Sequence, residues 1–308
     1  MSTVLVTGGA GFVGIPTVRR LLDAGHEVVV FDNFTVGTPE RLAALDPSRL
    51  RIVQGDLRDA REVHEAVVSS APQALIHLAA VHFIPYCDAH PAETLSVNVE
   101  GLQHVLDAAS AAGVGRLVFV STADVYSPSE TPHTEDDETV PGGVYGASKL
   151  VGEWLIRFWR QRGAATRPIV TRLFNVAGPG ETNPHVLSDI IEHLQRGDEV
   201  ALGNRTPRRD YVFVEDVAQV LVGLLDVDAS DVAVNLGSGR SWSVEDLVTR
   251  IAALTGRDLV IKTDPSKVRA TDRPNLQADL TRLQQLLPGF VPTPLDRTLA
   301  ETLAAAEL

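Results

Sequence analysis

Cysteine is nearly absent from this 308-residue sequence, which contains only Cys87. A lone thiol excludes an intrachain disulfide framework and any metal site built from several cysteines, and we expect no bound metal. No apolar run reaches the roughly 20 residues that span a bilayer. The N-terminal stretch MSTVLVTGG also lacks the basic and apolar regions of a signal peptide. These absences predict a cytoplasmic protein with no membrane anchor.

Positive charge is also scarce, because 27 lysines and arginines stand against 40 aspartates and glutamates and leave a formal net charge of −13. This balance argues against a surface that binds nucleic acid or anionic lipid. It is compatible with a small anionic ligand, since a few arginines can set the potential inside a cleft. The acidity by itself indicates no more than a soluble surface.

The first part of the chain alternates between short apolar runs and amphipathic stretches. Strands are predicted at Val4–Thr7, Glu27–Phe31, Arg51–Gln54, Ala74–Ala79, Arg116–Ser121 and Pro168–Leu173. Helices are predicted between them at Phe12–Ala24, Ala60–Ser70, Ala92–Ala112 and Tyr145–Gln161. Strands that are apolar on both sides and separated by helices indicate a doubly wound α/β fold, in which helices cover both faces of a parallel sheet.

This rhythm breaks after about residue 175, where shorter elements follow one another. We expect turns at Pro179–Pro184, a polar loop at Arg205–Tyr211, a strand at Val232–Leu236, and helices or short strands at Val186–Arg196, Val217–Leu225, Val244–Thr255, Leu259–Lys262, Thr281–Leu287 and Leu295–Ala306. The predicted organisation is a first domain at 1–174, to which 217–240 return. A smaller, interleaved α/β lobe at 175–216 and 241–308 would bind the substrate.

A glycine-rich turn joins the first strand to the first helix, in the sequence TGGAGFVG at 7–14. Gly8 permits the tight turn, Gly11 lets the backbone approach a pyrophosphate, and Gly14 lets helix and strand pack closely. This arrangement is typical of a Rossmann-type dinucleotide site, although the spacing is GxxGxxG rather than the more familiar GxGxxG.

An acidic residue, Asp32, ends the second strand, where a carboxylate can accept hydrogen bonds from both hydroxyls of the adenosine ribose. The same charge repels the 2′-phosphate of NADP, and no arginine follows immediately, so we expect NAD. Asp56, after the next strand, is a candidate acceptor for the adenine amino group, or an ordinary turn residue.

The sequence YGASK places Tyr145 and Lys149 one helical turn apart on the same face. An unperturbed tyrosine titrates near pH 10, which is too high for a general base at neutral pH. A neighbouring ammonium and an oxidised nicotinamide would both favour the phenolate. The spacing alone is common by chance. Together with the glycine turn and Asp32, it predicts a site for hydride and proton transfer.

Further motifs accompany this pair: HLAA at 77–80, NVEG at 98–101, STADVY at 121–126, RLFNVAGP at 172–179, RRDYVFVEDVA at 208–218 and NLGSG at 235–239. With them the sequence resembles, along essentially its whole length, the extended short-chain dehydrogenase/reductases. The resemblance is to their nucleotide-sugar epimerase and dehydratase branch, in the pattern of the UDP-hexose 4-epimerases. It implies an NAD-dependent 4-epimerase that acts on a UDP-hexose, UDP-HexNAc or UDP-hexuronate through a transient 4-keto intermediate.

The resemblance also implies roles for individual residues. Catalysis would fall to Tyr145, Lys149, Thr122 and Asp124. The cofactor would contact Gly8, Gly11, Phe12, Val13, Asp32, Asn33, Asp56, Leu57, Leu78, Ala79, Ala80, Asn98, Tyr145 and Lys149. The nucleotide-sugar would contact His82, Thr122, Asn175, His185, Val186, Arg209, Arg269 and Asp272. Each arginine can give a diphosphate two parallel hydrogen bonds.

Three departures from the family pattern bear on the reaction and the substrate. Related dehydratases carry an Asp–Glu pair where this sequence has Ala123 and Asp124, which weighs against 4,6-dehydration. Asp124 keeps decarboxylation of UDP-glucuronate open. Leu276 stands where hexose-selective epimerases often carry a bulky tyrosine, so a larger sugar could be admitted. His82 replaces a lysine.

Related enzymes commonly dimerise through the helices that correspond to residues 92–112 and 145–161, and a homodimer is therefore expected. The motifs leave open the identity of the sugar and the choice between UDP and dTDP.

Overall fold

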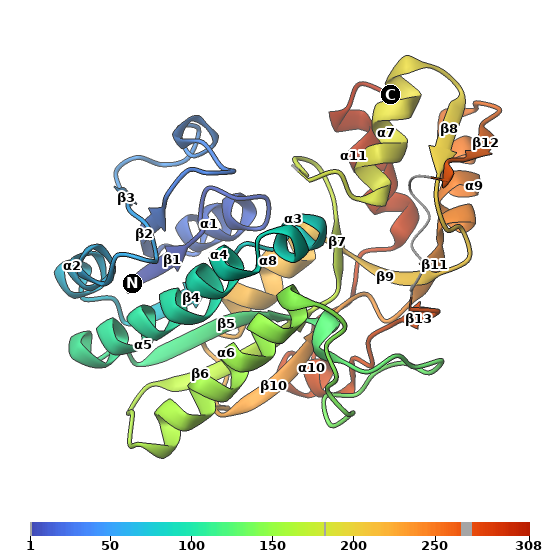
Figure 1. Cartoon of the computed structure of the whole chain (residues 1–308). Coiled ribbons are helices and arrows are strands. Elements are labelled where there is room, and N and C mark those ends of the chain that lie inside the picture. Colours follow the sequence, from blue (N-terminus) through green and yellow to red (C-terminus); the bar gives the residue numbers. More distant parts are fainter. Residues whose placement is uncertain (1, 182, 266–272) are drawn as a thin grey trace.

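The computed structural model describes residues 2–181, 183–265 and 273–308 and has a larger and a smaller lobe (Figure 1). The larger lobe is built on a seven-stranded parallel sheet with the order β3-β2-β1-β4-β5-β6-β10. The strands are β1 (Thr3–Thr7), β2 (Glu27–Asp32), β3 (Leu50–Gln54), β4 (Ala74–His77), β5 (Arg116–Thr122), β6 (Arg167–Leu173) and β10 (Val232–Leu236). The predicted doubly wound α/β fold is confirmed.

Alternation along each strand divides the apolar side chains between two helical layers. On one face, Val4 and Val6 pack with α1 (Gly14–Asp23), α8 (Val214–Gly223) and α10 (Thr281–Leu286). On the other face, Leu5 packs with α2 (Ala60–Ser70), α5 (Gly101–Ala112) and α6 (Val144–Gln161). Figure 1 shows α5 and α6 in front of the sheet and α8 behind it. Because both faces are covered, the strands carry almost continuous apolar runs.

The single helix predicted over Ala92–Ala112 is wrong in detail. The structure has α4 (Pro91–Leu95), a π-helical turn at Ser96–Glu100, and α5. The π turn carries Asn98, whose amide exchanges two hydrogen bonds of 2.8 Å with the backbone of Val81. A short helix, α3 (Ile84–Ala89), was not predicted. Strand β4 also ends two residues earlier than expected, at His77.

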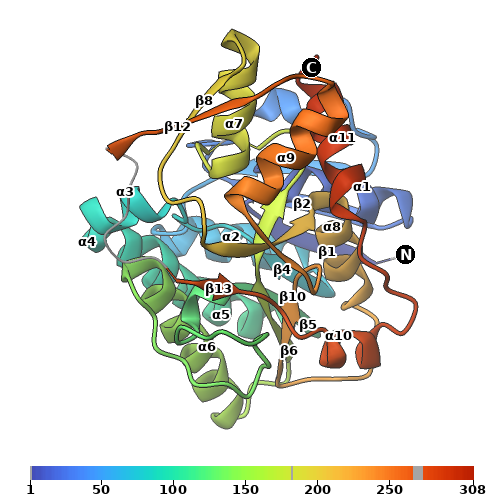
Figure 2. The same cartoon turned by 90° about the vertical axis from the view of Figure 1, so that its right-hand side faces the viewer.

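The smaller lobe is centred on β9 (Arg208–Phe213), which pairs with β7 (Asn175–Ala177), β11 (Ser241–Ser243) and β13 (Asn275–Leu276). Strands β8 (Glu199–Leu202) and β12 (Val260–Thr263) pair separately. Helices α7 (Val186–Arg196), α9 (Val244–Thr255) and α11 (Leu295–Ala305) supply most of its apolar core. Figure 2 shows these helices together, beside β8 and β12.

The polar loop predicted at Arg205–Tyr211 is wrong, because most of it belongs to β9. The arginines and the aspartate of this strand interrupt the apolar pattern by which a strand is predicted. They form hydrogen bonds within the protein, and Arg208 donates to the Ser241 carbonyl oxygen at 2.7 Å. Strand β10 pairs with β6 in the large sheet although it follows β9 in the chain. The domain boundaries proposed above stay a prediction.

Across the part of the chain that the structure describes, no helix has both the length and the apolar character needed to cross a membrane. The expected cytoplasmic location stays a prediction.

Asp210 of β9 holds two other segments of the chain, the one that follows β10 and the one that follows β13. Its Oδ1 accepts hydrogen bonds from the backbone N–H and the hydroxyl of Ser238, at 2.7 and 2.6 Å. Its Oδ2 accepts from the backbone N–H groups of Gly239 and Ala278, at 2.9 and 3.1 Å. Burial raises the pKa of Asp210 to about 6, and these hydrogen bonds oppose that rise.

Replacement of Asp210 by alanine should therefore destabilise the protein. Three backbone N–H groups, one buried and two partly buried, would lose their acceptor at about 1–3 kcal/mol each, and we expect the free energy of unfolding to fall by about 3–5 kcal/mol. Urea unfolding followed by circular dichroism measures this change. Asp228→Ala is the control, because the Asp228 side chain is 99% exposed and its ion pair is worth about 0–1 kcal/mol. Equal effects of the two substitutions would contradict the role assigned to Asp210.

Candidate functional site

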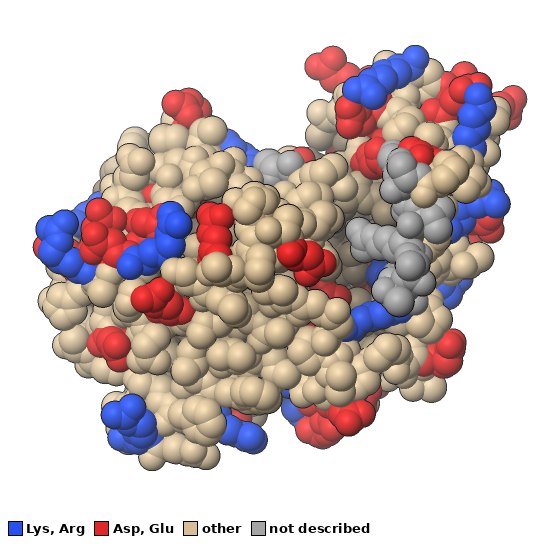
Figure 3. All heavy atoms as spheres, viewed as in Figure 1, with Lys and Arg blue, Asp and Glu red and all other residues tan. Residues whose placement is uncertain are grey.

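A cleft of about 1190 Å³ runs between the lobes at the carboxyl edge of the large sheet, where Figure 3 shows the surface hollowed. It gathers residues expected to act at the site from both lobes. They are Gly8, Gly11, Phe12, Val13, Asp32, Asn33, Asp56, Leu57, Leu78, Ala79, Ala80, His82, Thr122, Asp124, Tyr145, Lys149, Asn175, His185, Val186 and Arg209. Asn98 is not part of the lining, and Arg269 and Asp272 lie outside the described residues.

The glycine turn is closed against the end of β4. Gly8 has a φ of +71°, and a Cβ placed on it would lie 2.7 Å from the backbone nitrogen of Ala79. A Cβ on Gly14 would lie 2.6 Å from the carbonyl carbon of Gly9. Helix α1 begins at Gly14, so its N-terminus points to the turn, as required for a phosphate site. The turn therefore fits a pyrophosphate group.

The Asp32 carboxylate is fixed at the end of β2 by the loops on either side. Its Oδ2 accepts the backbone N–H of Ala10 at 3.0 Å, and its Oδ1 accepts the backbone N–H of Phe34 at 2.9 Å. Carboxylate oxygens have about four acceptor positions between them, so two remain for the hydroxyls of a ribose. This end of the cleft fits the adenosine half of NAD.

Asp56 is more heavily engaged than a free acceptor for adenine would be. Its two oxygens accept from Nε and Nη2 of Arg58, at 2.9 and 2.7 Å, and Asn33 donates to it at 3.3 Å. The hydrogen bond from the Arg58 guanidinium is the main cause that lowers the pKa of Asp56 to about 2. Arg58 also lines the cleft. Its position two residues after Asp56 was a signal that the motif analysis did not use.

Tyr145 and Lys149 lie in the first turns of α6, facing the carboxyl end of β5. Nζ of Lys149 donates to the carbonyl oxygen of Val120 at 2.8 Å and lies 5.0 Å from the centre of the Phe119 ring. Thr122 ends β5, and its hydroxyl accepts the backbone N–H of Asp124 at 3.2 Å. Phenol, hydroxyl and ammonium thus lie in the same part of the cleft.

The protein by itself does not favour the phenolate of Tyr145, contrary to the expectation from the Tyr–Lys spacing. Burial raises the pKa of Tyr145, the negative charge of Asp124 raises it further, and the hydrogen bond with Thr122 opposes both. Burial also lowers the pKa of Lys149 to about 7. A cation brought into the cleft by a ligand would lower the pKa of Tyr145.

Asn98 acts on the site through the backbone that it holds. In addition to its bonds with Val81, its Nδ2 donates to the hydroxyl of Ser148 at 3.0 Å, and this hydroxyl donates to the carbonyl oxygen of Tyr145 at 2.7 Å. The amide therefore ties the segment after β4 to the first turn of α6. Direct contact with the cofactor stays a prediction.

Two loops meet on the side of the cleft near β7. The Nε2 atom of His82 and the Nδ2 atom of Asn183 lie 2.8 Å apart. The rings of Phe83 and His185 pack edge to face at 6.0 Å. Asn175, the first residue of β7, lies opposite Tyr211 of β9. Asn183 was missed, because one asparagine in a turn-rich segment carries no signal of its own.

Arg209 reaches the cleft from β9 in the smaller lobe. Its Nη1 donates to the carbonyl oxygens of Arg208 and Arg273, both at 2.8 Å. Arg273 was not predicted, because nothing in the sequence shows that its side chain returns to the larger lobe. That side chain donates from Nη2 to the carbonyl oxygen of Asp124 at 3.0 Å.

Comparison with known proteins agrees with this geometry. A sequence model of the NAD dependent epimerase/dehydratase family matches residues 4–237. A UDP-glucose 4-epimerase of Corynebacterium glutamicum is 34% identical and aligns over 97% of this chain and 93% of its own length. Two solved structures have a similar fold. A UDP-glucose-4-epimerase from Stenotrophomonas maltophila with bound NAD and formylated UDP-arabinopyranose has a TM-score of 0.92 and 27% identity, over 100% of this chain and 98% of that one. MoeE5 in complex with UDP-glucuronic acid and NAD has a TM-score of 0.88 and 31% identity, over 99% of both chains.

We expect Asp32→Asn to weaken NAD binding, because the amide is neutral and its N–H₂ group faces backbone donors. Loss of charge-assisted hydrogen bonds should raise the Kd for NAD about tenfold or more, and the preference for NAD over NADP should shrink. Calorimetric titration of protein freed of nucleotide gives both constants. Asp107→Asn, on the exposed side of α5, is the control. An unchanged Kd in Asp32→Asn would contradict the proposed cofactor contact.

Proposed function

Since the chain belongs to the NAD dependent epimerase/dehydratase family, we propose that it is a UDP-sugar 4-epimerase, with a UDP-hexose, UDP-N-acetylhexosamine or UDP-hexuronate as its substrate. It is an NAD-dependent enzyme. The observation that carries the proposal is the placement of Tyr145, Lys149 and Thr122 in a cleft that also contains the glycine turn and, from the other lobe, Arg209.

In this proposal Tyr145 is the general base. Its phenolate takes the proton of the sugar C4 hydroxyl as the C4–O bond becomes a carbonyl, and the phenol returns a proton when the carbonyl is reduced. Thr122 orients the hydroxyl, and Lys149 holds the carboxyl end of β5 beside the phenol. When bound, NAD supplies a hydride acceptor that later gives the hydride back, and a positive charge that favours the phenolate. Arg209 holds the diphosphate.

Inversion at C4 requires the keto sugar to present its other face before reduction. Arg209 and Tyr145 must therefore be far enough apart for the nucleotide to stay bound at Arg209 while the sugar ring turns beside Tyr145. The volume of the cleft, about 1190 Å³, exceeds the roughly 300–1,000 Å³ of a pocket that holds one small ligand.

The identity of the sugar is open within this class. Leu276 of β13 is 4% exposed and lines the cleft. Its aliphatic side chain supports a substrate with a bulkier substituent than a plain hexose. One structural relative binds UDP-glucuronic acid and another binds a formylated UDP-pentose, so substituents at the distal end of the sugar are compatible with this fold.

A second candidate is decarboxylation of UDP-glucuronate, and Asp124 favours it. This carboxylate lies in the cleft lining and acts on the pKa of Tyr145. The neighbouring Ala123 is 1% exposed and has no acidic group, which argues against 4,6-dehydration. Release of carbon dioxide from UDP-glucuronate would identify a decarboxylase, and a 4-epimer with all its carbon atoms would identify an epimerase.

A homodimer is also proposed. Helix α6 exposes Trp154 and Phe158 one turn apart, with 49% and 55% of each residue accessible, and Leu95 of the adjacent α4 is 45% accessible. Figure 3 shows a mostly uncharged surface over α6. Large exposed apolar side chains that gather on neighbouring helices are typical of a protein interface.

We expect Tyr145→Phe to lose turnover by about 10²–10⁴-fold, as for removal of a general base, and to retain NAD. Product NMR after incubation with UDP-glucose, UDP-N-acetylglucosamine and UDP-glucuronate separately shows which sugar is converted. In the wild type the rate should rise with pH as the phenol of the loaded enzyme ionises, and the variant should lack this rise. Tyr86→Phe is the matched control, since Tyr86 donates to Glu93 at the rim. Equal rates in wild type and Tyr145→Phe would contradict the mechanism.

Replacement of Trp154 and Phe158 by glutamate should convert the proposed dimer to a monomer, because charges would be buried at the interface. Light scattering coupled to gel filtration measures the mass. Val291→Glu is the control, since Val291 is 80% exposed elsewhere on the surface. A wild-type protein that is monomeric at micromolar concentration would contradict the proposal.

A further inference from the structure

We propose that Arg273 is a positioning residue, which couples the diphosphate arginine, Arg209, to the turn at Thr122–Asp124 beside the catalytic tyrosine. This inference rests on the proposed function of the cleft. It assigns to one side chain of the smaller lobe the task of holding catalytic groups of the larger lobe.

The backbone of Arg273 is fixed within the smaller lobe. The next residue, Pro274, accepts the backbone N–H of Arg208 at 2.9 Å, and β13 then continues the pairing, with Leu276 opposite Arg209. The carbonyl oxygen of Arg273 itself accepts Nη1 of Arg209 at 2.8 Å. The position of the Arg209 guanidinium therefore depends on where this segment lies.

The side chain of Arg273 leaves its own lobe. Its Nη2 donates to the carbonyl oxygen of Asp124 at 3.0 Å, and its Nη1 approaches the carbonyl oxygen of Ala123 at 3.4 Å. These carbonyls belong to the 3₁₀ turn Ala123–Val125, which directly follows Thr122. A guanidinium suits this task, because its planar donors reach two neighbouring acceptors at once, whereas an ammonium is a point charge.

The charge of Arg273 matters as well as its hydrogen bonds. Burial lowers the pKa of Arg273, the Asp124 carboxylate opposes this, and the Arg209 guanidinium adds to it. Arg273 and Asp124 therefore act on one another, and Asp124 in turn raises the pKa of Tyr145. A positive charge beside Asp124 weakens the negative potential that the base experiences.

Other charged and titratable groups also act on this base, and none of them would be changed by a substitution at position 273. Among the described residues, Cys87 of α3 raises the pKa of Tyr145 and the hydrogen bond with Thr122 lowers it. The other titratable groups of this region are coupled to Lys149 of α6: Cys87 and Glu153 raise the pKa of Lys149, and Lys149 lowers the pKa of His77 and of His82. A shift in the titration of Tyr145 after such a substitution would therefore report on the pair Arg273–Asp124.

The experiment compares two variants. Arg273→Gln removes the charge, and Arg273→Lys keeps the charge but loses the planar pair of donors that reaches both carbonyl oxygens. In each NAD-loaded protein the phenolate of Tyr145 is titrated by absorbance, with the corresponding Tyr145→Phe protein as the blank, and the Kd for UDP is measured by calorimetry. Arg273→Gln should raise the midpoint of Tyr145 by about half a pH unit or more. Both variants should raise the Kd for UDP about fivefold or more, because the segment whose carbonyl oxygen accepts Arg209 would no longer be anchored to the larger lobe through the full set of Arg273 hydrogen bonds.

Neutralisation of Asp124 provides a second test, in which the shift should have the opposite sign. Asp124→Asn should lower the midpoint of Tyr145, and the double variant Arg273→Gln/Asp124→Asn should return it toward the wild-type value. Rescue by Arg273→Lys of the midpoint, but not of UDP affinity, would separate the charge from the hydrogen-bonding geometry. A residue that only stabilised the fold would not produce this pattern.

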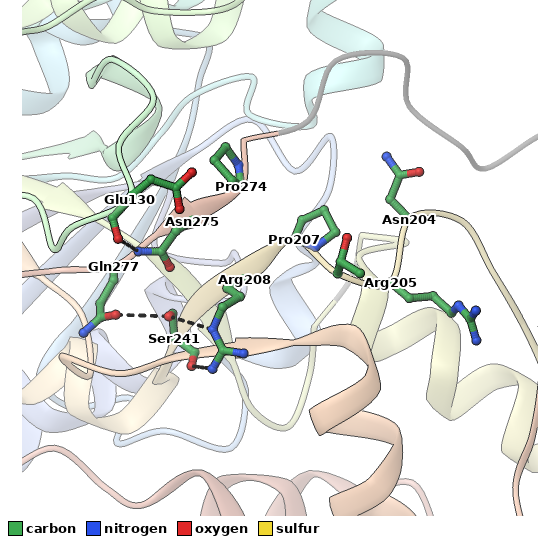
Figure 4. Close-up of a pocket in the computed structure, with 10 residues that line it drawn as sticks. Glu130, Asn204, Arg205, Pro207, Arg208, Ser241, Pro274, Asn275 and Gln277 are labelled. Carbon is green, nitrogen blue, oxygen red and sulfur yellow. Dashed lines mark hydrogen bonds between the residues drawn. The ribbon is translucent and has the colours of Figure 1, made fainter.

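Arg208→Gln is the matched control. Figure 4 shows the Arg208 guanidinium hydrogen-bonded to Ser241. The same guanidinium also donates to Asp246 within the smaller lobe. This variant should leave the titration of Tyr145 unchanged. Arg273→Gln with a wild-type midpoint and wild-type UDP affinity would overturn the proposal, as would an equal shift in Arg208→Gln. A wild-type protein that converts no UDP-sugar would refute the proposed function, while the titration of Tyr145 in that protein would still decide the role of Arg273.

Discussion

The backbone hydrogen bonds between β1 and its two neighbours, β2 and β4, set the position of most groups in the cleft. Because these strands run in the same direction, Thr7, Asp32 and His77 finish at one edge of the sheet. The chain then has to turn away from each strand in very little space. Only glycine at position 8 allows this, since any side chain there would meet the backbone of Ala79. The dinucleotide site is thus a result of how parallel strands end.

The same edge explains how much could be predicted from sequence. The strands of the large sheet are apolar on both faces, so their order of appearance and their burial follow from hydrophobicity alone. Gly8, Asp32 and Tyr145 carry signals because each sits at a fixed distance from a strand or helix end. The cleft lining accordingly contains the residues that the motifs indicated around the cofactor, with the exception of Asn98.

The roles of residues that contact distant segments of the chain could not be predicted from the sequence. Asn98 belongs to a family motif, yet the structure shows its amide on the backbone of Val81 and on Ser148, and no spacing rule reports this. Strand β9 looks polar because its arginines and Asp210 bond within the smaller lobe. The side chain of Arg273 reaches from the smaller lobe to the carbonyl oxygen of Asp124 in the larger one, and such a contact follows only from the three-dimensional structure. The pKa of Tyr145 also depends on burial, which a helical i,i+4 spacing does not measure.

Strand β10 has a consequence for the way in which this chain can fold. It closes the edge of the large sheet beside β6, but it follows β6 by about sixty residues, and β7, α7, β8, β9 and α8 intervene. During synthesis β6 therefore presents an open edge, with unpaired backbone groups, until the chain beyond residue 236 has left the ribosome. Asn235 of β10 then accepts a hydrogen bond from the hydroxyl of Tyr126 and donates one to the carbonyl oxygen of His133. The seven-stranded sheet of the larger lobe therefore cannot be completed before residues 175–216 of the smaller lobe have been synthesised, and a chain that ends before β10 would keep an unpaired sheet edge that favours aggregation.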